Sequence, residues 1–483
     1  MSRPFHHQLP DPSFWAYKTF ESADLGDLRL RNRLVAVAAG VAQRPAGRVT
    51  QVFSTAAERQ GAYDLLENNA FPTTAIQNAM GRGVAEQVTE AGMKSVYVVL
   101  DGSSIPIHDP DGEKGTGRVG TAEKKGRGFE VMSAIVLDDQ GVPQGVASQI
   151  YWARTGALKR KNHKMRPLAE KETRFWLQGM RESLDHFEEA RRFEEPAVRP
   201  HFLLDRGADA RYVLEEAVAL HREGKADTTV RVAYNRRIED QEVRYLRDRL
   251  ALSAVLCNYT LRVQAGPNRT ARFAQMQVRS CIVKLILKDP RTDKETHAAL
   301  GVVLTREVDT TPAGEKPIEW LLYTTRRVAT VQQACEVIRA YSLRWRIEEF
   351  HKTWKSGLCR VQDTQLRSAP AIQKWAMILA AVAVRAVRLS YAARRTPEAP
   401  ASDQLTEAEI DAVIVLRRPE GYGLGDRPAL HFVVRWIAEI GGYVGKSSGG
   451  PPGPIVIGRG LREVESAVRT IANLHELKGR ANL

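Results

Sequence analysis

The sequence contains few cysteines, no long apolar run and no recognisable secretory leader. Its four cysteines are far apart and form no CxxC pair, so we interpret them as incidental thiols of a reducing compartment: Cys257, Cys281, Cys335 and Cys359. The most apolar stretch, residues 376–384, is ended by Arg385 and is shorter than the roughly 20 residues of a membrane span. The N-terminal residues lack the apolar core of a signal peptide. We therefore expect a cytoplasmic protein without membrane contact, in which residues 376–384 form a buried helix.

The charge balance is positive. Lys and Arg number 71 against 57 Asp and Glu, a formal net charge of +14, and such an excess favours a polyanionic partner, with nucleic acid first. A generally basic proteome would give the same excess, so charge leaves that alternative open. A hydrophobic fraction of 43% with 27% charged residues is that of a folded protein and excludes disorder and collagen-like repeats. A length of 483 residues predicts two to four domains.

Residues 14–90 have the apolar spacing of helices, with polar and apolar positions recurring every three or four residues. Arg29, Arg31 and Arg33 follow one another at helix-compatible spacing, with only Asp24 and Asp27 as nearby acids. The pattern is typical of a small helical DNA-binding module. A solvated arginine face is an equally good interpretation of the same residues.

The period then changes to that of strands. An apolar, β-branched segment at residues 95–100 predicts a buried strand that ends directly at Asp101, and a second one at 201–204 stops in the same way at Asp205. Two further strands joined by a turn, and then a helix, lie between them: residues 129–137, 145–152 and 167–187. This order predicts an α/β fold with a ribonuclease H-like catalytic core, a mixed five-stranded sheet with helices.

The second half of the chain carries a β-rich block followed by helices. Residues 228–325 read mostly as strands, which we interpret as an insertion before the last core helices. A helix is predicted over 330–357, with room for a break, and another over 369–394. Residues 396–406 have linker composition, and the remainder reads as helical apart from a Gly/Pro-rich loop at 441–460.

The segment YSLRWRIEEFHKTWK is the most informative motif. Placed on one helix, its phenol, three cations and single carboxylate follow steps of three and four and share one face: Tyr341, Arg344, Glu348, Lys352 and Lys355. Such a one-sided cluster predicts a phosphate-facing surface with one metal ligand inside it. The alternative is that Glu348 forms ordinary i,i+4 ion pairs with Arg344 and Lys352.

Asp101, Asp205 and Glu348 together form a three-carboxylate set suited to two Mg²⁺ ions roughly 3.5–4 Å apart, an arrangement that acts on phosphodiesters. Asp109 and Asp209 are rivals, but neither directly follows an apolar run, so we interpret them as turn or helix-start residues. His351 lies within the motif but off its active face, and Trp345 lies beside that face, where core packing is the favoured interpretation.

The motif YSLRWRIEEFHKTWKSG resembles the Tyr-Arg-Glu-Lys signature of the insertion-sequence-four family of DDE transposases. LLDRGADARYVL and VVLDGSSI are similar to the segments around that family's second and first acids. LGDLRLRNRLVAVAAGVAQ and GAYDLLEN resemble its N-terminal DNA-binding domain, and WIAEIGGYVG part of its dimerisation region. The resemblance runs from about residue 15 to the end and is weakest in the β-rich insertion.

The resemblance implies cut-and-paste DNA transposition, in which terminal inverted repeats are bound, cut through a DNA hairpin and joined to target DNA. It places the catalytic, metal-binding acids on Asp101, Asp205 and Glu348, with two Mg²⁺ ions per site and Mn²⁺ as a substitute. It places DNA contacts on residues of the motif, on a tryptophan that stacks on a flipped base, and on the N-terminal arginines: Tyr341, Arg344, Lys352, Lys355, Trp320, Arg29 and Arg33. A homodimer in the synaptic complex is also implied.

The implied domains are a helical DNA-binding domain at 1–90, a catalytic domain at 91–395 and a helical dimerisation domain at 396–483. Two departures from the family stand out. Leu30 replaces one N-terminal arginine of the family. The family's basic DNA-binding residues after the second acid do not align cleanly either, so this role is open between Arg231, Arg236 and Arg237. A catalytically silent DNA-binding regulator and a ribonuclease H-like nuclease are the alternative functions.

Two basic segments are further candidates for DNA contacts, or else solvated loops. The first surrounds a literal GxGxxG at Gly115–Gly120 and includes Lys124 and Lys125. It neither follows a strand nor opens a clear helix, so a dinucleotide site is not expected. The second, residues 154–166, has six Lys and Arg and no acid.

Overall fold

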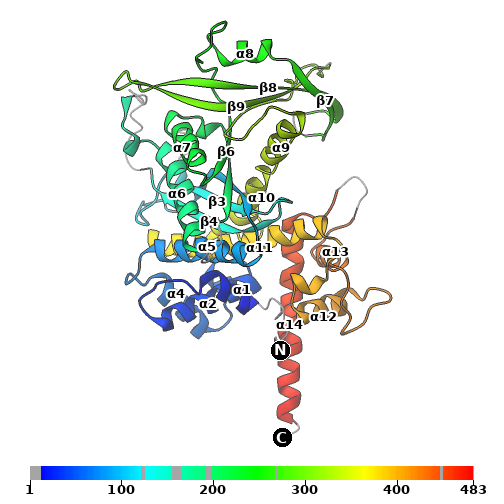
Figure 1. The fold of residues 1–483 in the computed structure, drawn as a ribbon. Coiled ribbons are helices and arrows are strands. Elements are labelled where there is room, and N and C mark those ends of the chain that lie inside the picture. Colours follow the sequence, from blue (N-terminus) through cyan, green and yellow to red (C-terminus); the bar gives the residue numbers. More distant parts are fainter. Residues whose placement is uncertain are drawn as a thin grey trace, which may run out of the picture. The chain divides into compact units, whose positions relative to one another are not determined.

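Figure 1 shows the computed structural model of the chain. The structure describes residues 12–120, 126–154, 165–191, 197–266, 269–309, 311–445 and 450–481. These residues form two compact units that are not successive along the chain. The first unit contains Met1–Gly92, Gly102–Thr155 and Arg346–Leu483, and the second contains Met93–Asp101 and Gly156–Trp345. Two elements, β1 and α10, contribute residues to both units. The three-domain division expected above remains a prediction.

The N-terminal part of the first unit is helical, as predicted. Its helices are α1 (Pro12–Phe20), α2 (Leu28–Gln43), α3 (Val49–Val52), α4 (Ala56–Leu66) and α5 (Thr73–Glu90). Their starts have local causes: the Asp27 side chain accepts a hydrogen bond from Arg29 N, and Thr55 and Glu58 form a capping box at α4. Gly26 allows the turn before Asp27 because its φ is +76°.

The first unit also holds the strands that follow these helices. They are the last residues of β1 (Ser95–Pro106), β2 (Gly117–Val119), β3 (Gly126–Leu137) and β4 (Pro143–Trp152), with β3 hydrogen-bonded to β2, β1 and β4. The predicted hairpin between β3 and β4 is confirmed: Asp138 Oδ1 accepts hydrogen bonds from Gln140 N and Val142 N. The GxGxxG segment enters β2, so no helix follows it and a dinucleotide-binding turn is excluded.

Helix α11 (Ala369–Arg395) is the buried helix predicted from the apolar stretch. Of the helices within the described residues, α11 alone is long and apolar enough to cross a membrane by length and composition. Its most apolar 18-residue window is 83% buried inside the protein. Trp375, Ile378 and Leu379 are fully enclosed, which is the environment of a core helix.

The C-terminal part of the first unit has a hydrophobic core of its own. It consists of η5 (Ala401–Asp403), α12 (Glu407–Arg417), α13 (Leu430–Ile440) and α14 (Pro454–Ala481), packed around Ile410, Val413, Val433 and Ile437. The predicted loop at 441–460 is shorter than expected, because α14 already begins at Pro454. Close packing of α13 and α14 requires glycine at their contact. A Cβ on Gly441 would lie 1.9 Å from Val456 O, and one on Gly460 would lie 1.8 Å from Ile437 O.

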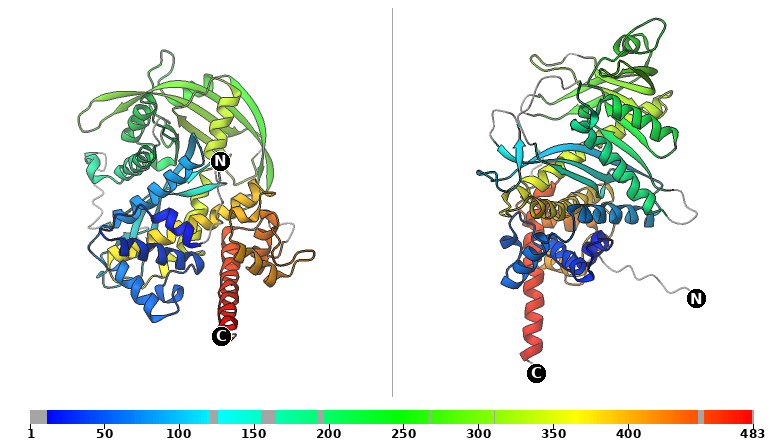
Figure 2. Two further views of the ribbon diagram at one scale, coloured as in Figure 1. Left: turned by 60° about the horizontal axis from the view of Figure 1, so that its bottom comes forward. Right: turned by 90° about the vertical axis from the view of Figure 1, so that its left-hand side faces the viewer.

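The second unit is built on a sheet with strand order β1-β5-β6-β10-β9-β8-β7. Its elements are α6 (Thr173–Glu189), β5 (Arg199–Leu204), α7 (Arg211–Arg222), β6 (Asp227–Arg231), α8 (Leu246–Leu252), β7 (Val255–Val263), β8 (Arg272–Lys288), β9 (Glu295–Glu307), β10 (Glu319–Thr324) and α9 (Val331–Ser342). Strands β1, β5 and β6 are parallel, and the rest of the sheet is antiparallel. Helices α6 and α7 pack together (Figure 1), and the long strands β8 and β9 are seen in Figure 2.

The sheet has more than the expected five strands, because strands of the predicted β-rich insertion join its edge. Strand β10 pairs antiparallel with β6 through Leu322 and Arg231, and β9, β8 and β7 then continue the same sheet. The physical reason is that β6 would otherwise leave a row of unpaired backbone groups at the edge of the parallel strands. Val278, Val303, Leu322 and Val337 form the hydrophobic cluster that holds helix α9 against these added strands.

Candidate active site

Three parallel strands of the second unit place three charged residues side by side. Leu100 on β1 is in register with Leu204 on β5, and Leu204 in turn with Val230 on β6. The next residues are Asp101, Asp205 and Arg231, which therefore lie in a row at the carboxyl end of this pairing, where parallel strands usually present ligand-binding groups. Sequence reasoning found the two acids. It left Arg231 in competition with two other arginines, because the strand before Arg231, with the sequence DTTV, is too short and polar to stand out as an apolar run.

The strand carrying the first acid is longer than predicted. β1 does not stop at Asp101 but continues to Pro106, while its parallel pairing with β5 ends at Leu100. Strand β5 does stop as predicted, and Asp205 then begins a short 3₁₀ turn, in which its Oδ1 accepts a hydrogen bond from Gly207 N at 2.7 Å. Both carboxylates are partly accessible to solvent.

Arg344 of the motif contacts the first acid directly. Its Nη1 lies 3.0 Å from Asp101 Oδ2, and the side chains of Arg344 and Asp101 are 16% and 17% exposed. A charge-assisted hydrogen bond in so restricted a space is stronger than one on the open surface. The structure thus brings the motif arginine to the first of the two acids, while its expected contact with DNA stays a prediction.

The motif itself is not one continuous helix. α9 ends at Ser342 and α10 (Trp345–Lys355) begins three residues later. Between them, Leu343 N donates to Ala340 O and Arg344 N donates to Tyr341 O, the tighter i,i+3 pattern that commonly ends a helix. The predicted single face therefore divides: Tyr341 lies on α9, Arg344 in the turn, and Glu348, Lys352 and Lys355 along α10.

The sequence predicted that Tyr341 lies on an open, phosphate-facing surface. Its side chain is instead buried, with only 3% of it exposed. It belongs to the hydrophobic cluster of α9, because the helix turns this position toward β10 and β9. Within the described residues, its buried hydroxyl makes no hydrogen bond of good geometry, although the Arg231 guanidinium is near enough to interact with it. Burial raises the pKa of Tyr341 to about 12, against the opposing charges of Arg344 and Arg231. An unpaired buried hydroxyl is unfavourable unless a ligand or water pairs with it.

Arg231 shares the surroundings of this tyrosine. Burial lowers the pKa of its guanidinium, the neighbouring Tyr341 opposes this effect, and the charges of Arg206 and Arg344 lower the pKa further. Arg231 Nη2 also donates to the Glu319 carbonyl at 2.9 Å, which fixes the side chain. Several cations gathered beside two carboxylates and a phenol form an environment suited to the oxygens of a phosphate.

The two competing arginines have structural partners instead. Arg236 Nη2 lies 2.7 Å from Asp209 Oδ1, and Asp209 Oδ2 accepts hydrogen bonds from the backbone N–H groups of Ala233 and Tyr234. Arg237 forms a 3.6 Å ion pair with Glu295. The interpretation of Asp209 as a turn residue fits this position, where its carboxylate joins two loops.

Trp320 lies where the sequence placed it, as the second residue of β10. Its ring meets that of Tyr341 edge to face, with centroids 5.4 Å apart and planes at 76°. The indole is partly exposed and packs against the cluster that buries Tyr341. Trp345 is 58% exposed, so the expectation that it packs in the core was wrong. The break before α10 turns Trp345 away from the apolar stripe.

The first unit carries the remaining motif residues. Glu348, Lys352 and Lys355 follow steps of four and three on α10 and so share one face of this helix. Lys355 Nζ donates to Ser103 Oγ at 2.9 Å. Ser103 is two residues beyond Asp101 on β1, so both side chains lie on the same face of that strand. Sequence reasoning missed Ser103, because a serine within a strand carries no distinctive signal.

Asp101 and Asp205 fit a divalent cation in chemistry, since adjacent carboxylate oxygens are the ligands that Mg²⁺ prefers. Over the described ranges, no group of three or more His, Cys, Asp and Glu side chains is gathered as a metal site. Glu348, the expected third ligand, belongs to the first unit.

The N-terminal arginines are on the surface of the first unit. Arg29, in the first turn of α2, is exposed, and Arg33 is exposed with Asp64 at 3.9 Å. Arg31 Nη1 instead donates to the Glu21 carbonyl, a structural contact. Of the two basic loops, residues 121–125 and 155–164 lie outside the described residues.

A row of two carboxylates and an arginine, with a buried phenol and further cations beside it, defines a site of the class that acts on the phosphodiesters of nucleic acids. The family model described as "Transposase DDE domain" matches residues 93–385, and the one described as "Transposase DNA-binding" matches residues 12–71. The first match covers more than half of the chain, so the protein belongs to the DDE transposase family. DNA is accordingly its partner, and the N-terminal helices are its DNA-binding part.

Proposed function

We propose that the protein is a cut-and-paste transposase of the insertion-sequence-four type, which cuts its element from DNA at terminal inverted repeats and joins it to a target. The observation that carries this proposal is the row formed by Asp101, Asp205 and Arg231, with Arg344 bound to Asp101. Two acids supply ligands for cations, and two guanidinium groups beside them can bind the non-bridging oxygens of the phosphate being cut. A DNA-binding regulator without catalysis has no need of the acids.

Asp101, Asp205 and Glu348 are the proposed metal ligands, for Mg²⁺ with Mn²⁺ as a substitute. When bound, a pair of such ions lowers the pKa of the attacking oxygen and neutralises charge on the leaving oxygen. The residues of the chain have separate tasks. Arg344 neutralises charge next to Asp101, and Lys355, held at Ser103, places its ammonium group on the same strand face.

Tyr341 and Trp320 are proposed to act on the DNA strand rather than on the metal. The Tyr341 hydroxyl makes no hydrogen bond of good geometry within the described residues, so a phosphate oxygen can satisfy it. Trp320 is held edge to face on Tyr341 with part of its indole exposed, which leaves a ring surface for a base turned out of the duplex. Base–aromatic stacking contributes about 1–3 kcal/mol, enough to favour the extrahelical base that a hairpin intermediate requires.

Binding of transposon ends is proposed for the N-terminal helices, with Arg29 and Arg33 on phosphates, and Lys352 of α10 supplements these contacts. The helical C-terminal part is proposed to pair two copies in the synaptic complex. Because its substrate is chromosomal, the protein is expected to work in the cytoplasm, on the nucleoid.

The test uses a supercoiled plasmid in which the DNA that flanks the coding sequence on both sides is cloned around a marker. Purified protein with Mg²⁺ should nick the marker ends, form covalently closed hairpins there and release the marker. Asp205→Asn should abolish nicking while binding to the same DNA persists. Asp293→Asn, at an exposed position of the same unit with φ +60°, is a matched control, since Asn tolerates that backbone conformation.

The outcomes separate the alternatives. Nicking without hairpins or strand transfer would indicate a general nuclease. Full nicking by Asp205→Asn would refute the assignment of the acids. DNA binding without any Mg²⁺- or Mn²⁺-dependent nicking by the unaltered protein would favour the silent regulator.

A further inference from the structure

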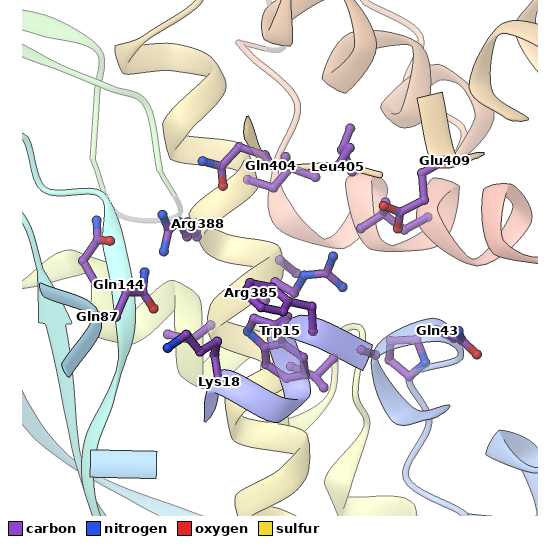
Figure 3. Close-up of a pocket in the computed structure, with 18 of the residues that line it drawn as sticks. Trp15, Lys18, Gln43, Gln87, Gln144, Arg385, Arg388, Gln404, Leu405 and Glu409 are labelled. Carbon is purple, nitrogen blue, oxygen red and sulfur yellow. The ribbon is translucent and has the colours of Figure 1, made fainter. Parts of the chain in front are cut away.

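The first unit encloses a cavity of about 340 Å³, whose wall includes none of the proposed metal ligands. Helices α1, α2 and α5, the middle of α11 and the C-terminal elements η5, α12 and α14 all contribute to its wall (Figure 3). This volume lies at the small end of the range for small-molecule sites, which are about 300–1,000 Å³. It is suited to a compact molecule rather than to a duplex.

Two arginines of α11 face this cavity. Arg385 and Arg388 are three residues apart and therefore lie on the same side of the helix. Within the described chain, neither guanidinium has a hydrogen bond or an ion pair shorter than 4.0 Å. Arg385 lies 5.6 Å from the centroid of the Trp15 ring, a cation–π contact. Burial lowers the pKa of Arg388, and the more distant Asp138 opposes this effect.

Amide side chains line the same cavity and retain hydrogen-bonding capacity. Gln87 and Gln144 lie beside Arg388 in Figure 3, and Gln43 and Gln404 line other parts of the wall. Gln144 donates to Asp138, whereas the amides of Gln43 and Gln87 have no hydrogen bond to any described residue. An amide has two N–H donors, which the oxygens of a phosphate can accept.

The carboxylates of the wall are mostly compensated, unlike the arginines. Glu409 accepts hydrogen bonds from Thr406 in the capping box of α12, and Glu90 lies 3.6 Å from Lys18. Burial raises the pKa of Glu86, and Glu21 raises it further. Glu465 has a partner as well, and Asp403 is exposed at the edge. Arg385 and Arg388 differ from these groups, because no described carboxylate lies within ion-pair distance of either guanidinium.

We propose that this cavity binds a nucleoside monophosphate. The phosphate dianion pairs with the guanidinium forks of Arg385 and Arg388, whose geometry suits phosphate oxygens. The flat base lies against Trp15, and the amide of Gln87, which lies beside Arg388, donates to the phosphate. Such a ligand would contact the DNA-binding helices, the long core helix and the C-terminal helices at once, and so would stabilise their packing.

The test is isothermal titration calorimetry of the full chain with adenosine 5′-monophosphate, adenosine and ribose 5-phosphate as probes. The monophosphate should bind at one site, and each half alone should bind at least about tenfold more weakly, because each keeps only part of the contacts. Arg388→Gln should raise the Kd of the monophosphate at least about tenfold, equivalent to about 1.4 kcal/mol. Arg395→Gln, an exposed position on the same helix, should leave the Kd within about twofold.

A melting curve of each variant shows whether it is folded. Should Arg388→Gln fail to fold, Gln87→Leu replaces it and should raise the Kd at least about threefold, since only the amide contact is lost. Any one of three results overturns the proposal. The first is the absence of saturable monophosphate binding at about 1 mM, and the second is an equal Kd for the unaltered protein and the folded cavity variant. The third is displacement of the bound monophosphate by a single-stranded oligonucleotide as efficiently as by the mononucleotide. The last result would identify a DNA-binding groove instead.

Discussion

Four aspartates of the chain have contrasting surroundings, although Asp109 lies shortly after Asp101 in the sequence and Asp209 shortly after Asp205. Asp101 and Asp205 are partly exposed and directly follow the last paired residues of two adjacent parallel strands, whereas Asp109 and Asp209 are buried. The Asp209 side chain is 0% exposed and is held by Arg236 and two backbone N–H groups. Burial raises the pKa of Asp109, but hydrogen bonds from Thr116 and the Lys114 N–H, with the charge of Arg127, outweigh it and lower that pKa.

The comparison teaches which property separates a reactive carboxylate from a structural one. A carboxylate whose acceptor sites are filled by the chain fixes the backbone around it and offers no oxygen to a cation. One that lies at the end of a strand pairing keeps an approach from solvent. All four residues are aspartates, and each buried one lies near an accessible one in the sequence. Only their positions in the fold and their bonding partners distinguish them.

The largest effect is expected from Asp101→Asn. Asparagine keeps the size of the side chain and can still accept a hydrogen bond from Arg344, but it removes the negative charge that a divalent cation needs. Strand cleavage should fall at least about 10⁴-fold, equivalent to about 5.5 kcal/mol of transition-state free energy. The measurement is the initial rate of Mg²⁺-dependent nicking of end DNA. An unchanged melting temperature is required, and a residual rate above one tenth would place Asp101 outside the site.

Asp209→Ala should instead damage the fold. It leaves the Arg236 guanidinium without its buried partner, and such a loss costs about 3–5 kcal/mol of unfolding free energy. Urea unfolding followed by circular dichroism measures this loss, and any activity of the remaining folded fraction should be normal. The double variant Asp209→Ala, Arg236→Met should recover much of the stability, since no unpaired charge then stays buried. No recovery would show that the backbone contacts of Asp209 carry the stability.

Part of this site could be read from the sequence, for identifiable physical reasons. An apolar run followed by an acid is a local pattern, so Asp101 and Asp205 could be proposed from the sequence, although β1 itself continues to Pro106. Helices α2 and α11 were found because apolar spacing, capping residues and length are local properties. The family's signature segment also drew attention to Arg344, which the structure brings to Asp101.

The rest depends on contacts between distant segments. The break between Ser342 and Trp345 interrupts a segment whose spacing suits one helix, and it both buries Tyr341 and exposes Trp345. The sequence alone does not show which of Arg231, Arg236 and Arg237 lies at the acids. Strand register shows it, because Val230 pairs with Leu204 and so brings Arg231 beside Asp205. Strands β10 and β6 pair residues more than 90 positions apart, which leaves no local signal, so the sequence did not indicate that the insertion extends the core sheet.

Tyr341→Phe tests the buried phenol. Because folding raises its pKa from an ordinary value near 10 to about 12, the native state favours the neutral form. Its stabilising contribution is complete below about pH 10 and is lost as the pH rises from there to about 12. The variant should lack this loss, a difference of about 2–3 kcal/mol across the window. Urea unfolding at several pH values measures it.

The exposed Tyr17→Phe is the control for Tyr341→Phe, and its stability should follow that of the unaltered protein at every pH. If both phenylalanine variants behave alike, the Tyr341 hydroxyl titrates as an accessible group, and the burial of this side chain is not maintained in solution.

The smallest effects are expected from two arginines. Arg231 lies beside the strand-end acids, as a proposed functional group, whereas Arg237 forms a structural ion pair. Arg231→Gln removes a guanidinium from the row of strand-end residues and should slow nicking about tenfold, equivalent to about 1.4 kcal/mol. Arg237→Gln breaks only an exposed pair with Glu295, so both nicking and unfolding free energy should change by less than about 0.5 kcal/mol. The readouts are nicking rates at two salt concentrations and urea unfolding. A larger loss of nicking in Arg237→Gln than in Arg231→Gln would contradict the assignment by register, because the two residues differ mainly in whether they follow a strand that ends beside Asp205.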